Sequence, residues 1–173
     1  PVGAAARARI RGRPRTGPRG GHQADLFTLP GFLPLSQCRT LIAAIDAAAV
    51  PSTLYREGKT PGIRTSSTHY FRGDPLALQL GQALDDLLGL DRNRAETMQG
   101  QRYRVGEEYR HHCDFFREKR PHWQTERLRG GQRSWTAMIY LNSPEAGGAT
   151  DFPKLGFAIA PQPGMLVVWN NMD

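Results

Sequence analysis

The stretch ETMQGQRYRVGEEYRHHCDFF, residues 96–116, marks the point where the spacing of apolar residues changes from helical to alternating. An alternating pattern with a period of two is typical of β-strands, and a glycine between two such runs is typical of a turn. We therefore predict two strands, residues 96–105 and 107–116, joined by a turn at Gly106.

The second of these runs carries the side chains with the most distinctive chemistry. Successive side chains of a strand point to opposite faces, so His112 and Asp114 should share one face and His111 and Cys113 the other. A His-x-Asp pair supplies two of the three ligands of a 2-His-1-carboxylate Fe(II) site, which leaves coordination positions open. Such a short match also arises by chance, as a surface histidine beside a salt-bridged aspartate.

Two amphipathic helices are expected before this stretch. In SQCRTLIAAIDAA, residues 36–48, Ser36 is a plausible N-cap, and one face carries Cys38, Leu41, Ile42 and Ile45. In DPLALQLGQALDDLLGL, residues 74–90, Asp74 is a good N-cap, Pro75 suits the first helical position and Gly89 should end the helix. Its apolar positions are Leu76, Leu80, Ala83, Leu84 and Leu87.

Three further segments after the stretch have the patterns of strands. SWTAMIYLN, residues 134–142, alternates; GGATDFP, residues 147–153, is short; and GFAIAPQPGMLVVWNN, residues 156–171, gives two strands broken at 161–164. Helices followed by a run of strands predict an α+β domain in which a curled antiparallel sheet has helices packed outside.

The positive charge is concentrated at the start of the chain. Six of the 23 Lys and Arg residues precede the first acidic residue, Asp25, so the remainder carries 17 basic against 16 acidic residues. We predict that residues 1–24 form a flexible Arg/Gly/Pro-rich tail, with nucleic-acid contact or a transit peptide as alternatives, and that residues 25–173 form one domain. The near-neutral domain argues against a nucleic-acid-binding face outside the tail.

Length and composition restrict the remaining possibilities. The 173 residues suffice for one domain, and no apolar run is long enough for a membrane-spanning helix. Pro1 is not a natural start, which leaves the removal of a leader open. Cys38 and Cys113 form no CxxC pair, which favours a reducing compartment, and we predict a cytoplasmic location.

Four ordered blocks of the chain, from about residue 64 onward, resemble the prolyl 4-hydroxylase branch of the 2-oxoglutarate- and Fe(II)-dependent dioxygenases. RTSSTHYF is similar to the family's Arg-Thr-Ser segment, and RSWTAMIYLN to its Arg-x-x-Thr-x-x-x-Tyr-Leu-Asn strand. GGATDFPKLGFAIAPQPGMLVVWNN resembles its Gly-Gly-x-Thr-x-Phe-Pro segment, turn and next strand. The Tyr-x-x-Gly-x-x-Tyr-x-x-His-x-Asp signature is matched by Tyr103, Gly106, Tyr109, His112 and Asp114.

The resemblance implies a double-stranded β-helix, or jelly-roll, core with the N-terminal helices packed outside. It also implies the cofactors: Fe(II), 2-oxoglutarate and O₂, with ascorbate as a further candidate. In this family 2-oxoglutarate is oxidised to succinate and carbon dioxide while a C–H bond is hydroxylated. The implied substrate is a prolyl residue in a peptide or protein, and recognition is expected in loops such as 51–70 and 117–132.

Roles carry over position by position. His112 and Asp114 match two iron ligands, Tyr103 matches the tyrosine whose hydroxyl reaches 2-oxoglutarate, and Thr150 matches a position that lines the cosubstrate pocket. Thr150 could equally be an ordinary strand residue.

Other positions match the substrate side of the family's site or no part of it. Tyr109 and Arg133 match positions that face the peptidyl proline, although Arg133 could also be a solvated charge at a strand start. Because Tyr109 lies at an odd offset from His112, its strand should bend near Arg110. Tyr140 and Trp169 are expected in the core, and the histidines out of register with the iron are His69, His111 and His122.

The chain departs from the family's pattern at its end. The family's second iron-binding histidine and its 2-oxoglutarate-binding lysine follow the strand that here reads GMLVVWNNMD. We therefore expect both, with the last strands of a C-terminally truncated domain, to lie beyond Asp173, and we expect weak iron binding by residues 1–173 alone.

Three alternatives remain open at this stage. One is the same chemistry on another side chain or a small molecule, and the second is a catalytically silent jelly roll used as a binding module. The third is an RNA-associated factor that binds through the Arg-rich tail.

Overall fold

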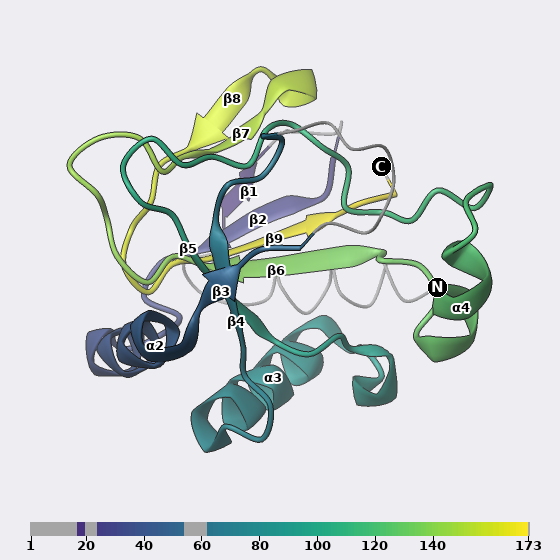
Figure 1. The fold of residues 1–173 in the computed structure, drawn as a ribbon, viewed down its shortest axis with the longest axis horizontal. Helices are drawn as coiled ribbons and strands as arrows, with labels where there is room; N and C mark the ends of the chain where they lie inside the picture. Colours follow the sequence, from purple (N-terminus) through teal and green to yellow (C-terminus); the bar gives the residue numbers. More distant parts are fainter. Residues whose placement is uncertain (1–16, 20–23, 54–61, 173) are drawn as a thin grey trace.

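The protein folds as a set of small antiparallel sheets with helices on their outer side (Figure 1), in a computed structural model that describes residues 17–19, 24–53 and 62–172. The largest sheet has the order β1-β2-β9-β6, with bounds Gly17–Arg19, Leu26–Leu29, Leu166–Asn170 and Trp135–Ile139. The second has the order β3-β4-β5, with bounds Val50–Pro51, Ser67–Tyr70 and Gln99–Arg102. A third pairs β7, Thr150–Phe152, with β8, Phe157–Ile159. The predicted α+β class is confirmed at this level.

Two helices, α2 (Leu35–Ala48) and α3 (Pro75–Leu88), lie on the same side of the sheets in Figure 1. The start and end signals of α3 act as predicted. Asp74 Oδ1 accepts a hydrogen bond from the Ala77 amide at 2.8 Å, and Gly89 ends the helix in the left-handed conformation at φ 68°. Its buried residues are Ala77, Leu80, Leu87 and Leu88, whereas Ala83, expected on the apolar face, is exposed.

The expected N-cap of α2 is wrong. The helix begins at Leu35 after Pro34, and no side chain caps it, so Ser36 lies within its first turn. Proline fixes φ in a range suited to entering a helix, which moves the start before the serine. The apolar face is nevertheless as predicted for Cys38, Leu41 and Ile45, while Ile42 is half-buried.

Strand β9 forms the centre of the core because both of its faces are covered. Leu166, Val167 and Val168 are each 0% exposed. Leu166 and Val168 pack with Phe27, Leu87 and other residues beneath α3, while Val167 packs with Leu26 and Ile159 on the opposite face. The neighbouring strand β6 alternates in the same way, as its sequence predicts: Trp135, Ala137 and Ile139 meet the first cluster and Met138 the second.

The predicted strand 107–116 is not formed. After the turn at Gly106 the segment runs beside residues 63–65 through a single bridge between Arg64 and Tyr109. The amides of Arg110 and Thr65 bond to carbonyls across this gap, but the Glu108 amide bonds to the side chain Thr65 Oγ1 at 2.8 Å. A side-chain acceptor there takes the place of a ladder bond, and the strand before Gly106, β5, pairs with β4. The predicted bend near Arg110 therefore occurs in irregular backbone.

Regular structure also appears in segments that were expected to be loops or tail. Strands β3 and β4 occupy part of the expected loop 51–70, and helix α4, Trp123–Arg129, occupies part of 117–132. Gly17–Arg19, expected in the flexible tail, pairs with Leu26–Thr28; the other residues before 24 lie outside the described residues. None of the described helices has both the length and the apolar character needed to cross a bilayer.

Candidate active site

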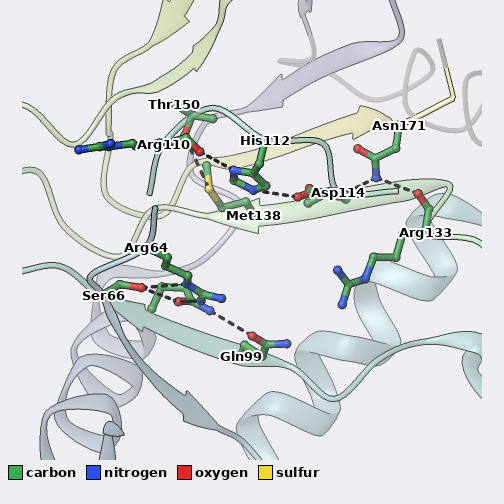
Figure 2. Close-up of polar contacts among 12 residues, drawn as sticks. Arg64, Ser66, Gln99, Arg110, His112, Asp114, Arg133, Met138, Thr150 and Asn171 are labelled. Atoms are coloured by element: carbon green, nitrogen blue, oxygen red, sulfur yellow. Dashed lines mark hydrogen bonds and ion pairs between the residues drawn. The ribbon is translucent and has the colours of Figure 1, made fainter. Parts of the chain in front are cut away.

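His112 and Asp114 face each other on the irregular segment that follows Gly106 (Figure 2). His112 Nε2 lies 3.1 Å from Asp114 Oδ1, and the two side chains are 31% and 23% exposed. The segment is not a strand, but its alternation has the predicted effect on direction. The exposed side chain of His111 has its Nε2 2.8 Å from Oδ2 of Asp151 in β7, and Cys113 is also exposed.

The remaining polar atoms of this pair are held by hydrogen bonds. His112 Nδ1 lies 2.7 Å from the Arg110 carbonyl oxygen, which can only accept, so Nδ1 carries the proton and donates. Asp114 Oδ2 accepts a hydrogen bond from Thr136 Oγ1 at 2.8 Å. The two atoms left facing each other are His112 Nε2 and Asp114 Oδ1.

These two atoms fit adjacent positions around one metal ion. With metal–ligand bonds of about 2.1 Å, donors at a right angle lie ~3 Å apart, close to the 3.1 Å seen here. A histidine whose other nitrogen donates to a carbonyl is also the usual form of a metal ligand. Within the described part of the chain, no group of three His, Cys, Asp or Glu side chains could hold a metal ion. The residues present therefore fit two of the three positions of a 2-His-1-carboxylate site.

The electrostatics of the pair favour a charged aspartate. Burial opposes ionisation of Asp114, but hydrogen bonds from His112 and Thr136 and the charge of Arg133 outweigh it and lower the pKa of Asp114. Burial also acts to lower the pKa of His112, and the bonds to Asp114 and Arg110 outweigh it, so the net change is upward. A proton on Nε2 and a metal ion would compete for the same lone pair.

An aromatic and cationic stack supports the histidine. The Tyr109 ring lies parallel to the His112 ring, with centroids 3.5 Å apart, and the Arg64 guanidinium lies 4.8 Å from the centroid of the Tyr109 ring. Arg64 is itself fixed by Ser66 Oγ at 3.0 Å, Thr68 Oγ1 at 3.2 Å and Gln101 Oε1. Tyr109, expected at the substrate mouth, thus packs against the ligand pair itself.

The candidates for cosubstrate binding lie in two places. Tyr103 follows β5 beside the polar face that carries Ser66 and Arg64, and burial raises the pKa of its hydroxyl despite these neighbours. Thr150 begins β7, where its Oγ1 lies 2.6 Å from the Tyr140 hydroxyl and 3.7 Å from Met138 Sδ. Tyr103 interacts electrostatically with Tyr109, which stacks on His112, and Thr150 lies near His112 in Figure 2.

Arg133 is engaged by an acidic partner that the sequence did not suggest. Its guanidinium pairs with both carboxylate oxygens of Glu96, through Nε and through Nη2 at 2.7 Å, and lies 4.5 Å from the centroid of the Phe116 ring. Arg133 is therefore ion-paired and partly exposed at the start of its strand. The positive charge of Arg133 also helps to lower the pKa of Asp114, so Arg133 lies near the ligand pair.

The other aromatic and histidine residues lie where the sequence predicts or away from the pair. Trp169 packs in the core against Phe152. His69 contacts Phe71, and His122 precedes α4 and contacts Phe116. Tyr140 packs in the core but directs its hydroxyl at Thr150, so it joins the candidate cosubstrate region after all.

Sequence reasoning assigned no role to four residues that shape the site: Arg64, Glu96, Thr136 and Asn171. Each acts through a partner at least 22 positions away along the chain, as in Thr136 to Asp114 and Arg133 to Glu96. Asn171 donates from Nδ2 to Thr136 Oγ1 at 2.9 Å and to the Arg133 carbonyl at 3.0 Å. The Arg and Thr of the β6 motif were visible in the sequence, but not their partners.

Tyr140→Phe should lower the free energy of unfolding by about 1–2 kcal/mol. The hydroxyl accepts from the Thr150 amide at 3.0 Å and donates to the Ile159 carbonyl at 2.9 Å, so its removal leaves polar groups of β7 and β8 without partners. Urea unfolding of the metal-free protein measures the change, and Tyr70→Phe on the exposed side of β4 is the matched control. Equal stability losses in both variants would contradict the role of the buried hydroxyl.

Comparisons with known proteins agree on one group. Residues 98–173 match the model of the 2OG-Fe(II) oxygenase superfamily. The chain is 36% identical over 115 residues to prolyl 4-hydroxylase subunit alpha-1 of Rattus norvegicus, covering 65% of this chain and 21% of that protein. For the Homo sapiens subunit the values are 33% over 127 residues, 72% and 24%. The chain thus spans less than a quarter of the length of these curated relatives.

The fold is also similar to that of a solved enzyme. The 2OG complex of the viral collagen prolyl hydroxylase vCPH from Paramecium Bursaria Chlorella virus-1 matches with a TM-score of 0.62 and 27% identity. The match covers 84% of this chain and 77% of the viral chain.

Proposed function

We propose that this chain belongs with the prolyl 4-hydroxylase-like 2-oxoglutarate- and Fe(II)-dependent dioxygenases, which it resembles, and that it is part of an enzyme that hydroxylates a prolyl residue in a peptide or protein. The observation that carries the proposal is the convergence of His112 Nε2 and Asp114 Oδ1 at 3.1 Å, each with its other polar atom already bonded. On this proposal the described sheets form part of a jelly-roll core.

The ligand pair would hold Fe(II), which together with 2-oxoglutarate and O₂ supplies the oxidising power when bound. His112 contributes a neutral imidazole whose orientation is set by the Arg110 carbonyl. Asp114 contributes a carboxylate whose pKa is lowered, so it is charged at neutral pH. The hydroxyls of Tyr103 and Thr150 are suited to donate hydrogen bonds to a 2-oxoglutarate carboxylate.

The substrate side is assigned to Tyr109 and Arg133. The Tyr109 ring stacks on His112 and carries the Arg64 guanidinium, so its edge is the part suited to contact a pyrrolidine ring beside the metal. The guanidinium of Arg133 is held by Glu96, so its direction is fixed before any peptide arrives. Ascorbate as a reductant remains a prediction. A cytoplasmic location also remains a prediction; the two cysteines, which form no disulfide with each other, are compatible with it.

Succinate release from 2-oxoglutarate tests the function directly. The full-length protein should form succinate with Fe(II) in the presence of proline peptides, and the peptides should gain one oxygen by mass spectrometry. Peptides with alanine in place of proline are the control. Hydroxylation of a different side chain or small molecule would replace the substrate class, and absence of turnover with any of them would favour a silent binding module.

Arg133→Lys should raise the peptide KM or lower kcat for the peptide, while the KM for 2-oxoglutarate changes little. Lysine cannot reproduce the two-point contact with Glu96, so the cation loses its fixed direction. Paired kinetics, with the peptide varied and then 2-oxoglutarate varied, measure the effect. A defect confined to the KM for 2-oxoglutarate would assign Arg133 to the cosubstrate instead.

A further inference from the structure

We propose that Thr136 and Asn171 are positioning residues: the Thr136 hydroxyl, held by Asn171, occupies Oδ2 of Asp114 and so reserves Oδ1 for a metal ion. The inference rests on the proposed function in so far as it takes Asp114 as a metal ligand. Neither residue is a ligand itself, since each acts only through the carboxylate. In Figure 2 the side chain of Asn171 points at the backbone carbonyl of Arg133, and Asp114 lies nearby.

The three side chains form one continuous chain of hydrogen bonds. Asn171 Nδ2 lies 2.9 Å from Thr136 Oγ1, and Thr136 Oγ1 lies 2.8 Å from Asp114 Oδ2. Asp114 Oδ1, at the far end of the carboxylate, lies 3.1 Å from His112 Nε2. The chain therefore approaches the ligand pair from the side opposite to the imidazole.

The direction of each bond follows from which atoms can donate. A backbone carbonyl only accepts, so the Asn171 atom 3.0 Å from the Arg133 oxygen must be the amide nitrogen. A carboxylate only accepts as well, so the single hydroxyl proton of Thr136 points at Asp114 Oδ2. Thr136 Oγ1 then has lone pairs for the second proton of the Asn171 amide. No other arrangement satisfies all three contacts.

Rigid backbone holds both positioning residues. Thr136 lies in β6 opposite Trp169 of β9, and Asn171 comes directly after β9. The backbone N–H of Asn171 also donates to the Ser134 carbonyl at 2.8 Å. Asp114, by contrast, lies on the irregular segment after Gly106, where no ladder fixes it. The sheet thus orients a carboxylate that its own segment leaves free to rotate.

A carboxylate with one oxygen bonded in this way presents the other oxygen to a metal ion. Without the Thr136 hydroxyl, both oxygens become equivalent, and the carboxylate can rotate or bind through both. Groups that orient metal ligands typically change affinity or activity by about 10- to 100-fold when removed. A loss of this size is expected here, without loss of the fold.

Mn(II) binding to the full-length protein, measured by electron paramagnetic resonance with 2-oxoglutarate and without O₂, tests the proposal. Thr136→Val keeps the shape but removes the hydroxyl, and should weaken Mn(II) binding by about 10-fold or more. Thr136→Ser restores the hydroxyl and should bind within about 3-fold of wild type. Thr40→Val is the matched control, since the Thr40 hydroxyl bonds only the Ser36 carbonyl on the exposed side of α2.

The pathway through Asn171 has its own readout. Asn171→Ala should weaken Mn(II) binding less than Thr136→Val, and the double variant should be no weaker than Thr136→Val alone, because both act through one hydroxyl. Additive losses would overturn the shared pathway. Wild-type affinity in Thr136→Val, or equal affinity losses in the Ser and Val variants, would overturn the role of Thr136.

Failure of the inference can be told from failure of the proposed function. Mn(II) affinity is measured without any prolyl substrate. If Thr136→Val loses Mn(II) while the wild type hydroxylates no proline peptide, the positioning role stands and the prolyl substrate is wrong. If the full-length wild type binds no Mn(II), both the metal site and the positioning role are wrong.

Discussion

Asp114→Ala in the full-length protein is expected to abolish 2-oxoglutarate turnover and metal binding while leaving the fold intact. Removing a group that only orients a ligand costs about 10- to 100-fold, so removing the anionic ligand itself should cost more than that. The carboxylate is 23% exposed and its main contacts are His112 and Thr136, so the fold does not depend on it. Succinate release and Mn(II) binding measure the first effect.

Thermal unfolding of the metal-free protein separates ligand loss from misfolding. A partly exposed ion pair is worth about 0–1 kcal/mol, and the Tm should therefore fall by no more than about 4 °C. Asp151→Ala is the matched control because it also removes a carboxylate bonded to a neighbouring histidine, His111, at 2.8 Å. That variant should turn over normally. Near-normal turnover in Asp114→Ala would exclude a ligand role.

The largest loss of stability is expected from Gly164→Ala, at about 3–5 kcal/mol, or roughly 10 °C in Tm. Gly164 has φ +78°, and an added Cβ would lie 2.2 Å from the Leu33 carbonyl oxygen, far inside contact distance. The residue also exchanges backbone hydrogen bonds, accepting from the Leu33 amide at 3.0 Å and donating to the Tyr140 carbonyl at 2.7 Å. To relieve the clash, the backbone just before β9 would have to move, and this movement would break one of these hydrogen bonds.

Gly156→Ala measures the cost of a left-handed backbone conformation without any close contact of the added Cβ. Gly156 has φ +71° but nothing lies within 4 Å of an added Cβ, so only the left-handed backbone penalises alanine there. That penalty is about 1–2 kcal/mol. Urea unfolding of both variants should show the larger loss for Gly164→Ala, and equal losses would mean that the Leu33 contact relaxes without cost.

The parts of the fold that the sequence predicted correctly are those determined by neighbouring residues. Helix α3 has its cap, its proline and its terminal glycine within its own segment, and the alternation of β6 reflects two apolar clusters on its two faces. The segment 107–116 alternated as well, but its partner is the irregular stretch 63–65, and the Thr65 hydroxyl accepts a bond that a ladder would place on a carbonyl. A period of two does not reveal whether a partner strand exists.

The same distinction applies to the site. His112 and Asp114 are two residues apart, so a local pattern sufficed to pair them. Glu96 and Arg133 are brought together by the fold, as are Thr136 and Asn171. Nothing in the sequence near these residues indicates their partners, because acidic and amide side chains are common on any surface.

Because Asn171 directly follows β9, metal binding on this proposal depends on the correct register of that strand. A slip of β9 by one residue would exchange Leu166 and Val168 with Val167 between the two faces, and would carry Asn171 away from Thr136. A misaligned sheet could remain compact and partly apolar inside, yet it would leave the Asp114 carboxylate without its fixed orientation. Metal would then be retained best by molecules whose strands are in register, so bound metal would selectively stabilise the correctly folded population.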